Sequence, residues 1–118
     1  MTYVDGFVIA VPTANKEAYR TVAEAMVPLF KDYGALSVVE CWGDDVPDGE
    51  VTSFPMAVKA TADESVVFSW ITWPDKATRD AGMARMMEDE RMAGMDPENM
   101  PFDAKRMIMG GFEAIVEA

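Results

Sequence analysis

The sequence contains no histidine, a single cysteine and few basic residues. Without His, the chain cannot form a Ser-His-Asp triad, a His-ligated haem or most catalytic zinc sites. One Cys allows no internal disulfide, which is typical of a protein from a reducing cytoplasm. The 10 Lys and Arg residues are outnumbered by 21 Asp and Glu residues, so the net charge is −11. A surface this negative repels phosphate backbones, and we expect no nucleic-acid partner.

Long hydrophobic runs are also lacking. No segment reaches the roughly 18 apolar residues of a membrane span, so we expect no membrane partner. Near the N-terminus Asp5 interrupts the apolar run and no Lys or Arg precedes it, unlike in a secretory signal. We therefore expect a cytoplasmic protein. The 118 residues are 50% hydrophobic and 26% charged, a globular composition that predicts one domain spanning residues 1–118.

The spacing of apolar residues predicts alternating strands and helices. A first helix should begin at a cap on Thr13 or Asn15, be kinked or ended by Pro28, and stop at Gly34. A second helix should begin at Asp75 and end near residue 87, with a separate turn continuing to about residue 95. The predicted strands are residues 3–11, 36–42, 54–60, 66–73 and 105–117, with the third and fourth forming a hairpin.

The glycine pair Gly110-Gly111 lies inside the last predicted strand. Paired glycines in a strand indicate a bulge or a close backbone approach. The pair does not open a helix, so it is not a phosphate-binding loop.

This order of elements predicts an α+β, ferredoxin-like split βαβ sandwich, in which two helices cover one face of an antiparallel sheet. The strands are nevertheless apolar on both faces, as Phe68 and Trp70 on one side and Ile71 and Trp73 on the other illustrate. A bare apolar sheet face would exceed what a monomer usually exposes. We therefore expect a homodimer in which two sheets meet as a dimeric α/β barrel.

Four long segments carry a resemblance to a known family. They read VDGFVIAVP, LFKDYGALSVVECWGDDVPDGEVT, VVFSWITWPDKATRD and MPFDAKRMIMGGFEAI. Together they resemble the YbaA-like family of small bacterial proteins over nearly the whole chain. That family is classed as a domain of unknown function within the dimeric α/β-barrel superfamily. The resemblance implies the fold and a dimer but no reaction, because the superfamily includes monooxygenases, haem-degrading enzymes, isomerases and stress-induced barrels.

Charged residues inside predicted strands are the candidate catalytic groups, namely Asp5, Glu40, Lys59 and Arg106. A carboxylate beside an aromatic ring in an apolar pocket has a raised pKa and can act as an acid or base. A nearby Lys or Arg could hold an anion or an oxyanion. The alternative is that these residues form structural ion pairs, Glu40 with Lys59 and Asp5 with Arg106.

Aromatic and methionine side chains are the candidate ligand-pocket residues. We single out Trp42, Trp70, Met107 and Met109, and eight of the eleven methionines lie in the last third of the chain. Methionine suits an adaptable binding surface, although core filling and a dimer interface remain alternatives. A thioether site for Cu(I) is the third alternative for the methionines.

We expect neither a catalytic nor a metal-binding role for Cys41 and the acidic loop that follows it. Cys41 has no His to activate it and a carboxylate beside it, so we expect an inert thiol. The acidic loop at residues 43–53 lacks the ligand spacing of a calcium loop. We expect no metal and no cofactor.

Three functions remain open. The first is a small-molecule-binding or stress-type dimeric barrel that takes a small apolar or aromatic ligand. The second is a cofactor-independent monooxygenase or isomerase that uses Glu40 with Arg106 or Lys59. The third is a structural or protein-binding dimer. We favour the first because the chain has an apolar lining but no recognisable catalytic set.

Overall fold

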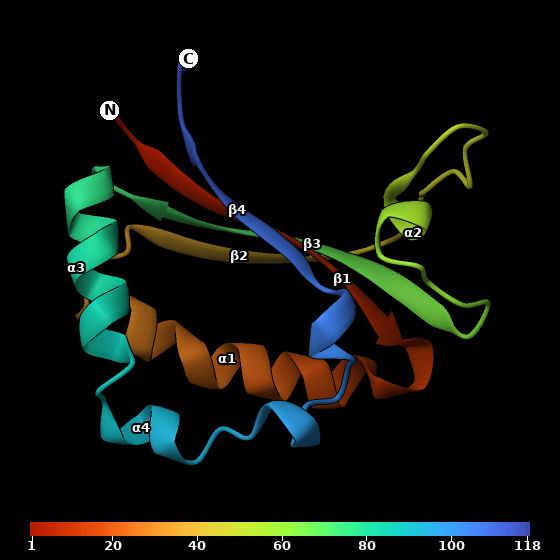
Figure 1. Ribbon diagram of the computed structural model, residues 1–118, viewed down its shortest axis with the longest axis horizontal. Helices are drawn as coiled ribbons and strands as arrows, with labels where there is room; N and C mark the ends of the chain where they lie inside the picture. Colours follow the sequence, from red (N-terminus) through yellow and green to blue (C-terminus); the bar gives the residue numbers. More distant parts are fainter.

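An antiparallel sheet forms the centre of the computed structural model, which describes residues 1–118 apart from the Pro97 side chain. Its four strands are β1 (Tyr3–Pro12), β2 (Ser37–Trp42), β3 (Glu64–Trp73) and β4 (Ile108–Glu113), and their spatial order is β2-β3-β1-β4. Every neighbouring pair is antiparallel. This arrangement, visible in Figure 1, confirms the predicted ferredoxin-like α+β fold.

Two helices, α1 (Lys16–Asp32) and α3 (Lys76–Met86), lie on the same side of this sheet (Figure 1). A 3-10 turn (Thr13–Asn15) leads into α1, and Pro28 lies within a helix that nevertheless continues to Asp32. The predicted cap of α3 is confirmed, since the Asp75 carboxylate accepts a hydrogen bond of 2.7 Å from the Thr78 amide. The separate turn after α3 is the short helix α4 (Glu90–Ala93).

The strand register assigns every strand side chain to one of two faces. On the helix-covered face, Asp5 pairs with Ile71 and Ile9 pairs with Val67. These side chains pack with Tyr19 and Trp73 into the core beneath the sheet. The opposite face, which we call the open face, is covered by neither of these helices, and at one end of it Val58 packs on Ala10 and Val66. It carries Val4, Val8, Val39, Cys41, Phe68, Trp70, Ile108 and Phe112.

The predicted strand at residues 54–60 is wrong. A short helix, α2 (Phe54–Ala57), stands there instead. The Ser53 hydroxyl caps it by accepting a 3.1 Å hydrogen bond from the Met56 amide, and Pro55 fits its first turn. Lys59 then adopts a left-handed φ of 52°, which a strand residue does not. The hairpin partner of β3 is consequently β2, reached across the long connection at residues 43–63.

The last strand is shorter than predicted and has no bulge. A 3-10 turn capped by Asp103 occupies residues 104–106, so β4 begins only at Ile108. Gly110 pairs with Gly6 and Gly111 with Asp5 in unbroken register. The close approach at Gly111 comes from a side chain, because an added Cβ would collide with the Tyr3 ring.

Among the described residues, no helix is both long and apolar enough to span a bilayer.

Candidate functional site

A cavity of about 280 Å³ lies between α1 and the helix-covered face of the sheet. The sheet supplies one wall and α1 the opposite wall. A methionine-rich stretch near the C-terminal end of the chain closes the third side. The lining residues are almost all apolar: Phe7, Ile9, Tyr19, Val22, Ala23, Met26, Phe30, Val38, Glu40, Ser69, Trp70, Ile71, Met92, Met95, Met100, Phe102 and Met107.

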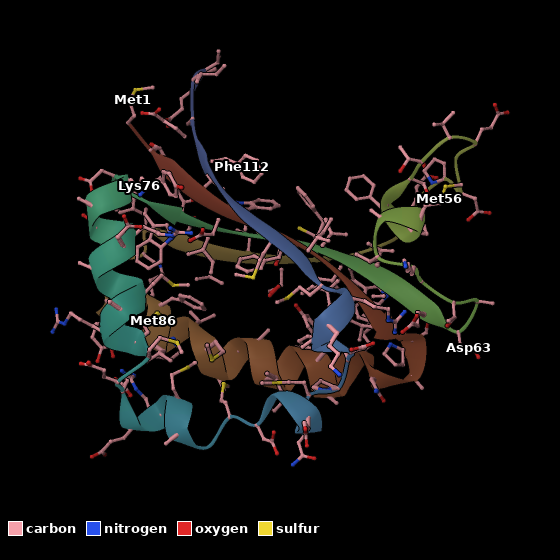
Figure 2. All side chains as sticks on the ribbon, viewed as in Figure 1. Met1, Met56, Asp63, Lys76, Met86 and Phe112 are labelled. Carbon is pink, nitrogen blue, oxygen red and sulfur yellow. The ribbon has the colours of Figure 1, made fainter. Side chains whose placement is uncertain are left out.

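The closing stretch, residues 89–107, is here called the methionine segment. Its N-terminal end is tied to α1 by a 2.6 Å hydrogen bond from the Tyr33 hydroxyl to Asp89 and by a 2.9 Å ion pair between Arg91 and Asp32. Further along, the Asn15 amide donates a 3.0 Å hydrogen bond to the Pro101 carbonyl. These polar ties hold the segment against α1 while its thioethers face the cavity, and Figure 2 shows sulfur atoms gathered around α1.

One end of the cavity is polar. The Tyr19 hydroxyl lies 3.0 Å from both carboxylate oxygens of Glu40 and donates its hydrogen to them. Glu40 is on β2, and Ser69 occupies the register position beside it on β3. The Glu40 residue as a whole is exposed, but Tyr19 of α1 shields part of its carboxylate. This partial burial raises the pKa of Glu40, and hydrogen bonds from Tyr19 and Ser69 lower it by less. Burial and the neighbouring carboxylate raise the pKa of Tyr19, so its hydroxyl stays protonated.

A second, outer groove of about 360 Å³ runs between α1 and the edge strand β2. It shares Tyr19, Ala23, Val38 and Glu40 with the inner cavity, so the Tyr19–Glu40 pair lies where the two meet. Lys16 and Arg20 supply its positive charge, and the Lys16 ammonium sits 5.5 Å from the centre of the Trp42 ring. A carboxyl with a raised pKa beside an apolar space can accept hydrogen bonds or exchange a proton.

The structure does not assemble the four charged residues singled out from the sequence. Asp5 is 3% exposed and lies in the core, away from the cavity lining. Its carboxylate accepts hydrogen bonds from Trp73 Nε1 at 2.9 Å and from Arg79 Nη2 at 2.8 Å. The predicted ion pair of Asp5 with Arg106 is therefore wrong.

Arg106 instead forms a two-pronged pair with Glu64, at 2.8 and 2.6 Å, and also binds Asp103. This guanidinium lowers the pKa of Glu64 to about 2. Lys59 is exposed on the connection after α2, and its carbonyl accepts a hydrogen bond from Arg106. Among the described side chains, Glu40 and Lys59 form no ion pair. The structure therefore does not bring Glu40, the expected acid or base, together with Arg106 or Lys59, the expected anion-holding residues.

The four pocket candidates are divided among different surfaces. Trp42 packs on the helix-covered face beside the core and lines the outer groove. Trp70 is among the residues that line the cavity, although its ring lies 5.6 Å from that of Phe68 on the open face. Met107 lines the cavity, whereas Met109 is exposed on the edge strand β4. Cys41 is half-buried on the open face.

Sequence reasoning missed the residues that surround Glu40. Tyr19 matches the apolar stripe of α1, and nothing local indicates that its hydroxyl meets a strand 21 residues away. Ser69 offered a signal, because it is the single hydroxyl among the apolar residues 66–71 of β3. In the sequence, Lys16 and Arg20 resemble ordinary solvent-exposed residues. Their place in the outer groove depends on the packing of β2 beside α1.

Within the part of the chain that the structure describes, no group of three or more His, Cys, Asp or Glu side chains is placed to hold a metal ion.

Comparison with known proteins places the chain among relatives. A model of the DUF1428 family, described as protein of unknown function, matches residues 2–104. The proteins named "Uncharacterized protein YbaA" from Escherichia coli K12 and from Shigella flexneri are each 60% identical over 117 residues, covering 99% of both chains. The resemblance recognised from the four sequence segments is thereby confirmed.

A solved structure supports the fold independently. The crystal structure of a dimeric ferredoxin-like protein from an uncultured marine organism aligns with a TM-score of 0.61, covering 99% of this chain and 98% of that one. The two chains are 10% identical, so this likeness concerns the fold alone. Taken with the match over residues 2–104 and the 60% identity to YbaA, the chain belongs to the DUF1428 family.

Proposed function

We propose that this protein binds a small, largely apolar molecule in the cavity between α1 and the sheet. The observation that carries the proposal is the lining, in which apolar side chains from three strands, α1 and the methionine segment converge on about 280 Å³. Protein cores are normally packed without spaces of this size. Pockets that hold small molecules are typically apolar with a few polar groups, and this one lies near the small end of their range, roughly 300–1,000 Å³.

The methionines suit such a role. Five thioether side chains line the cavity, from Met26, Met92, Met95, Met100 and Met107. Each is unbranched and polarizable, so it can adjust its rotamers around a ligand at small cost. A bound apolar molecule would recover dispersion contacts that the lining lacks while the cavity is empty.

The test is a titration followed by NMR of methionine methyl groups labelled with carbon-13. With 2-methoxynaphthalene or 1-methylindole as the probe, the methyl signals of the five cavity methionines should shift. The signals of Met1, Met56 and Met87, which are exposed elsewhere, should not. Shifts confined to the exposed methionines, or no shifts with any probe of this size, would reject the proposal.

A matched pair of variants sharpens this test. Ala23→Leu adds volume inside the cavity, whereas Ala25→Leu adds the same volume at an exposed position on the same helix. We expect Ala23→Leu to weaken probe binding about tenfold, because the added atoms take ligand space and one or two methylenes are worth roughly that much. Ala25→Leu should bind as the original protein does.

We also infer that two copies associate through the open face. Three large apolar side chains on it remain uncovered, with Phe68 45%, Ile108 44% and Phe112 63% exposed. Figure 2 shows Phe112 on the side of the sheet turned away from α1. Phe54 of α2 extends the patch, since its ring lies 5.8 Å from that of Phe68.

The edges of the open face support a second copy as its occupant. The loop at residues 43–53 carries Val51, and residues 114–118 carry Ile115 and Val116, all at least 84% exposed. Figure 1 shows both segments extending on the side away from α1. A sheet between two projecting apolar segments fits an identical sheet with the same segments, and self-complementary twofold pairs are the commonest oligomers. The ferredoxin-like relative is itself described as dimeric.

Sedimentation velocity checks the assembly over a range of concentrations. The protein should sediment at twice 13.0 kDa. Phe112→Lys should weaken association at least about tenfold, because it places a charge in a buried apolar interface. Met87→Lys, which alters an exposed methionine on the other side, should leave the dimer intact. A mass of 13.0 kDa at every concentration would contradict the inference.

A further inference from the structure

The polar end of the cavity indicates the chemical class of the ligand, provided that the proposed binding function holds. Glu40 and Ser69 are the polar side chains there, together with the Tyr19 hydroxyl. The single hydrogen of that hydroxyl is already donated to Glu40. What this end offers an incoming molecule is therefore mainly the acceptor capacity of a carboxylate. Its two oxygens can accept about four hydrogen bonds in total.

Positive charge is placed elsewhere. Lys16 and Arg20 line the outer groove and are absent from the described lining of the inner cavity. An anionic head group inside the cavity would face the Glu40 carboxylate without a cation beside it, which is costly in an apolar surrounding. The net charge of −11 adds long-range repulsion of anions.

A neutral hydrogen-bond donor on the ligand, unlike an anionic group, would be attracted to the Glu40 carboxylate. The Tyr19 hydroxyl lies 3.0 Å from both oxygens of the Glu40 carboxylate, so on the side of α1 this carboxylate has fewer water molecules to accept from. A donor on the ligand would replace that lost hydration. Hydrogen bonds to an ionised group are about twice as strong as those between neutral groups.

The rest of the lining favours an aromatic body. Phe7, Phe30 and Phe102 line the cavity together with the five methionines. Sulfur atoms make favourable contacts with aromatic rings, and ring edges pack favourably against ring faces. A flat aromatic molecule can use both kinds of contact in a narrow space beneath the sheet.

We propose that the ligand is a small aromatic molecule with a neutral hydrogen-bond-donating group, a hydroxyl or a ring N–H, which it directs to the Glu40 carboxylate. Aromatic carboxylates are disfavoured, because the inner cavity presents the Glu40 carboxylate while Lys16 and Arg20 line only the outer groove. Tyr19 and Ser69 act as positioning residues, because they hold the carboxylate in place through its hydrogen bonds.

The experiment compares matched probes by calorimetry at neutral pH, using the full chain. 2-Naphthol is paired with 2-methoxynaphthalene, and indole with 1-methylindole, so that each pair differs only in the donor. We expect the donor of each pair to bind about tenfold tighter or more, as the loss of a hydrogen bond to a charged group implies. 2-Naphthoate should bind more weakly than 2-methoxynaphthalene. The naphthol and indole pairs separate a hydroxyl from an N–H as the preferred donor.

Two variants link the preference to Glu40. Glu40→Gln should reduce the affinity for 2-naphthol about fivefold and leave that for 2-methoxynaphthalene unchanged, because it removes charge but keeps shape. Glu24→Gln is the matched control, since Glu24 lies on the outer groove but not in the cavity lining. It should leave both affinities unchanged.

The outcomes separate this inference from the proposed function. Equal binding of donor and capped probes, or tightest binding of 2-naphthoate, would overturn the donor inference while the cavity remains a binding site. Binding of none of the probes would overturn both. The probe comparison uses the unaltered protein, so it decides the matter even if Glu40→Gln folds poorly.

Discussion

At the scale of single residues, the charged side chains of this protein divide into structural and site-forming groups. Asp5 and Arg106, both conspicuous in the sequence, are each saturated by protein partners. Glu40 is the exception, because its protein partners are two hydroxyls and no cation. A sequence identifies a charge inside a strand, but its partner depends on which helix packs over it. Asp5 meets Arg79, which lies 74 residues away on α3.

Removal of the Asp5 carboxylate should destabilise the fold. In Asp5→Ala, Trp73 Nε1 loses its acceptor and the Arg79 guanidinium, whose side chain is 24% exposed, loses its buried partner. We expect the free energy of unfolding to fall by about 3 kcal/mol, as for other broken buried pairs. Urea denaturation measures the change. Asp80→Asn, which removes an exposed partner of the same Arg79, should cost under about 1 kcal/mol.

Acid should weaken the Glu64–Arg106 pair in a defined window. Because Arg106 holds the folded pKa of Glu64 near 2, below its ordinary value of 4.5, the ionised pair stabilises the fold fully above pH 4.5. That contribution is lost as the pH falls from 4.5 towards 2. Glu64→Gln should therefore be less stable than the original protein at neutral pH. Between pH 4.5 and 2 it should lose less stability than the original protein does. Denaturation curves at a series of pH values test this, and Glu50→Gln, on the exposed loop, should keep the original slope.

At the scale of elements, apolar periodicity predicted the strands and helices around the core but not those that depend on local capping. Residues 54–60 alternate as a strand would, yet Ser53 and Pro55 favour a helix start, and no neighbouring strand competes for this segment. The last strand was overextended for a similar reason, because Asp103 caps a turn just before it. In both places a capping side chain outweighs the hydrophobic pattern.

The contact between α3 and the sheet depends on Gly82. A Cβ there would lie 2.9 Å from the Trp73 ring and would also press on the Tyr33 carbonyl, neither of which can move freely in the core. Gly82→Ala should therefore destabilise by about 2 kcal/mol, even though Ala favours helices by about 1 kcal/mol. Gly94→Ala, where nothing lies within 4 Å, should change stability by under about 0.5 kcal/mol. Equal effects in thermal unfolding would show that packing at Gly82 is looser than described.

At the scale of the whole molecule, the sequence predicted the ferredoxin-like fold. It also predicted a second apolar sheet face that the two helices of one copy do not cover. It did not predict where the cavity lies. The cavity exists because α1, three strands and the methionine segment leave a space that no single element encodes. The abundance of methionines in the last third of the chain was the nearest signal in the sequence, and Met107, one of the four pocket candidates, lines the cavity. Trp42 and Trp70 were grouped because both are aromatic, yet the register places them on opposite faces.

The net charge of −11 should make stability depend on salt. Repulsion among exposed carboxylates acts over the Debye length, which shrinks from about 30 Å at 0.01 M salt to about 10 Å at 0.1 M. We expect the melting temperature to rise by a few degrees over this range of sodium chloride, since screening relieves self-repulsion in the compact state. A melting temperature that falls with salt would mean that the exposed ion pairs, such as Lys76–Asp80, outweigh the net charge.

The position of β1 has a consequence for how the chain folds. This strand is bounded on one side by β3 and on the other by β4, whose Glu113 lies opposite Tyr3. During synthesis, one long edge of β1 therefore stays unpaired until residues near 113 have been made. Such long-range pairing slows folding and leaves an aggregation-prone edge exposed in the meantime. The nascent chain should consequently complete its sheet only once β4 has been made and is free to pair with β1.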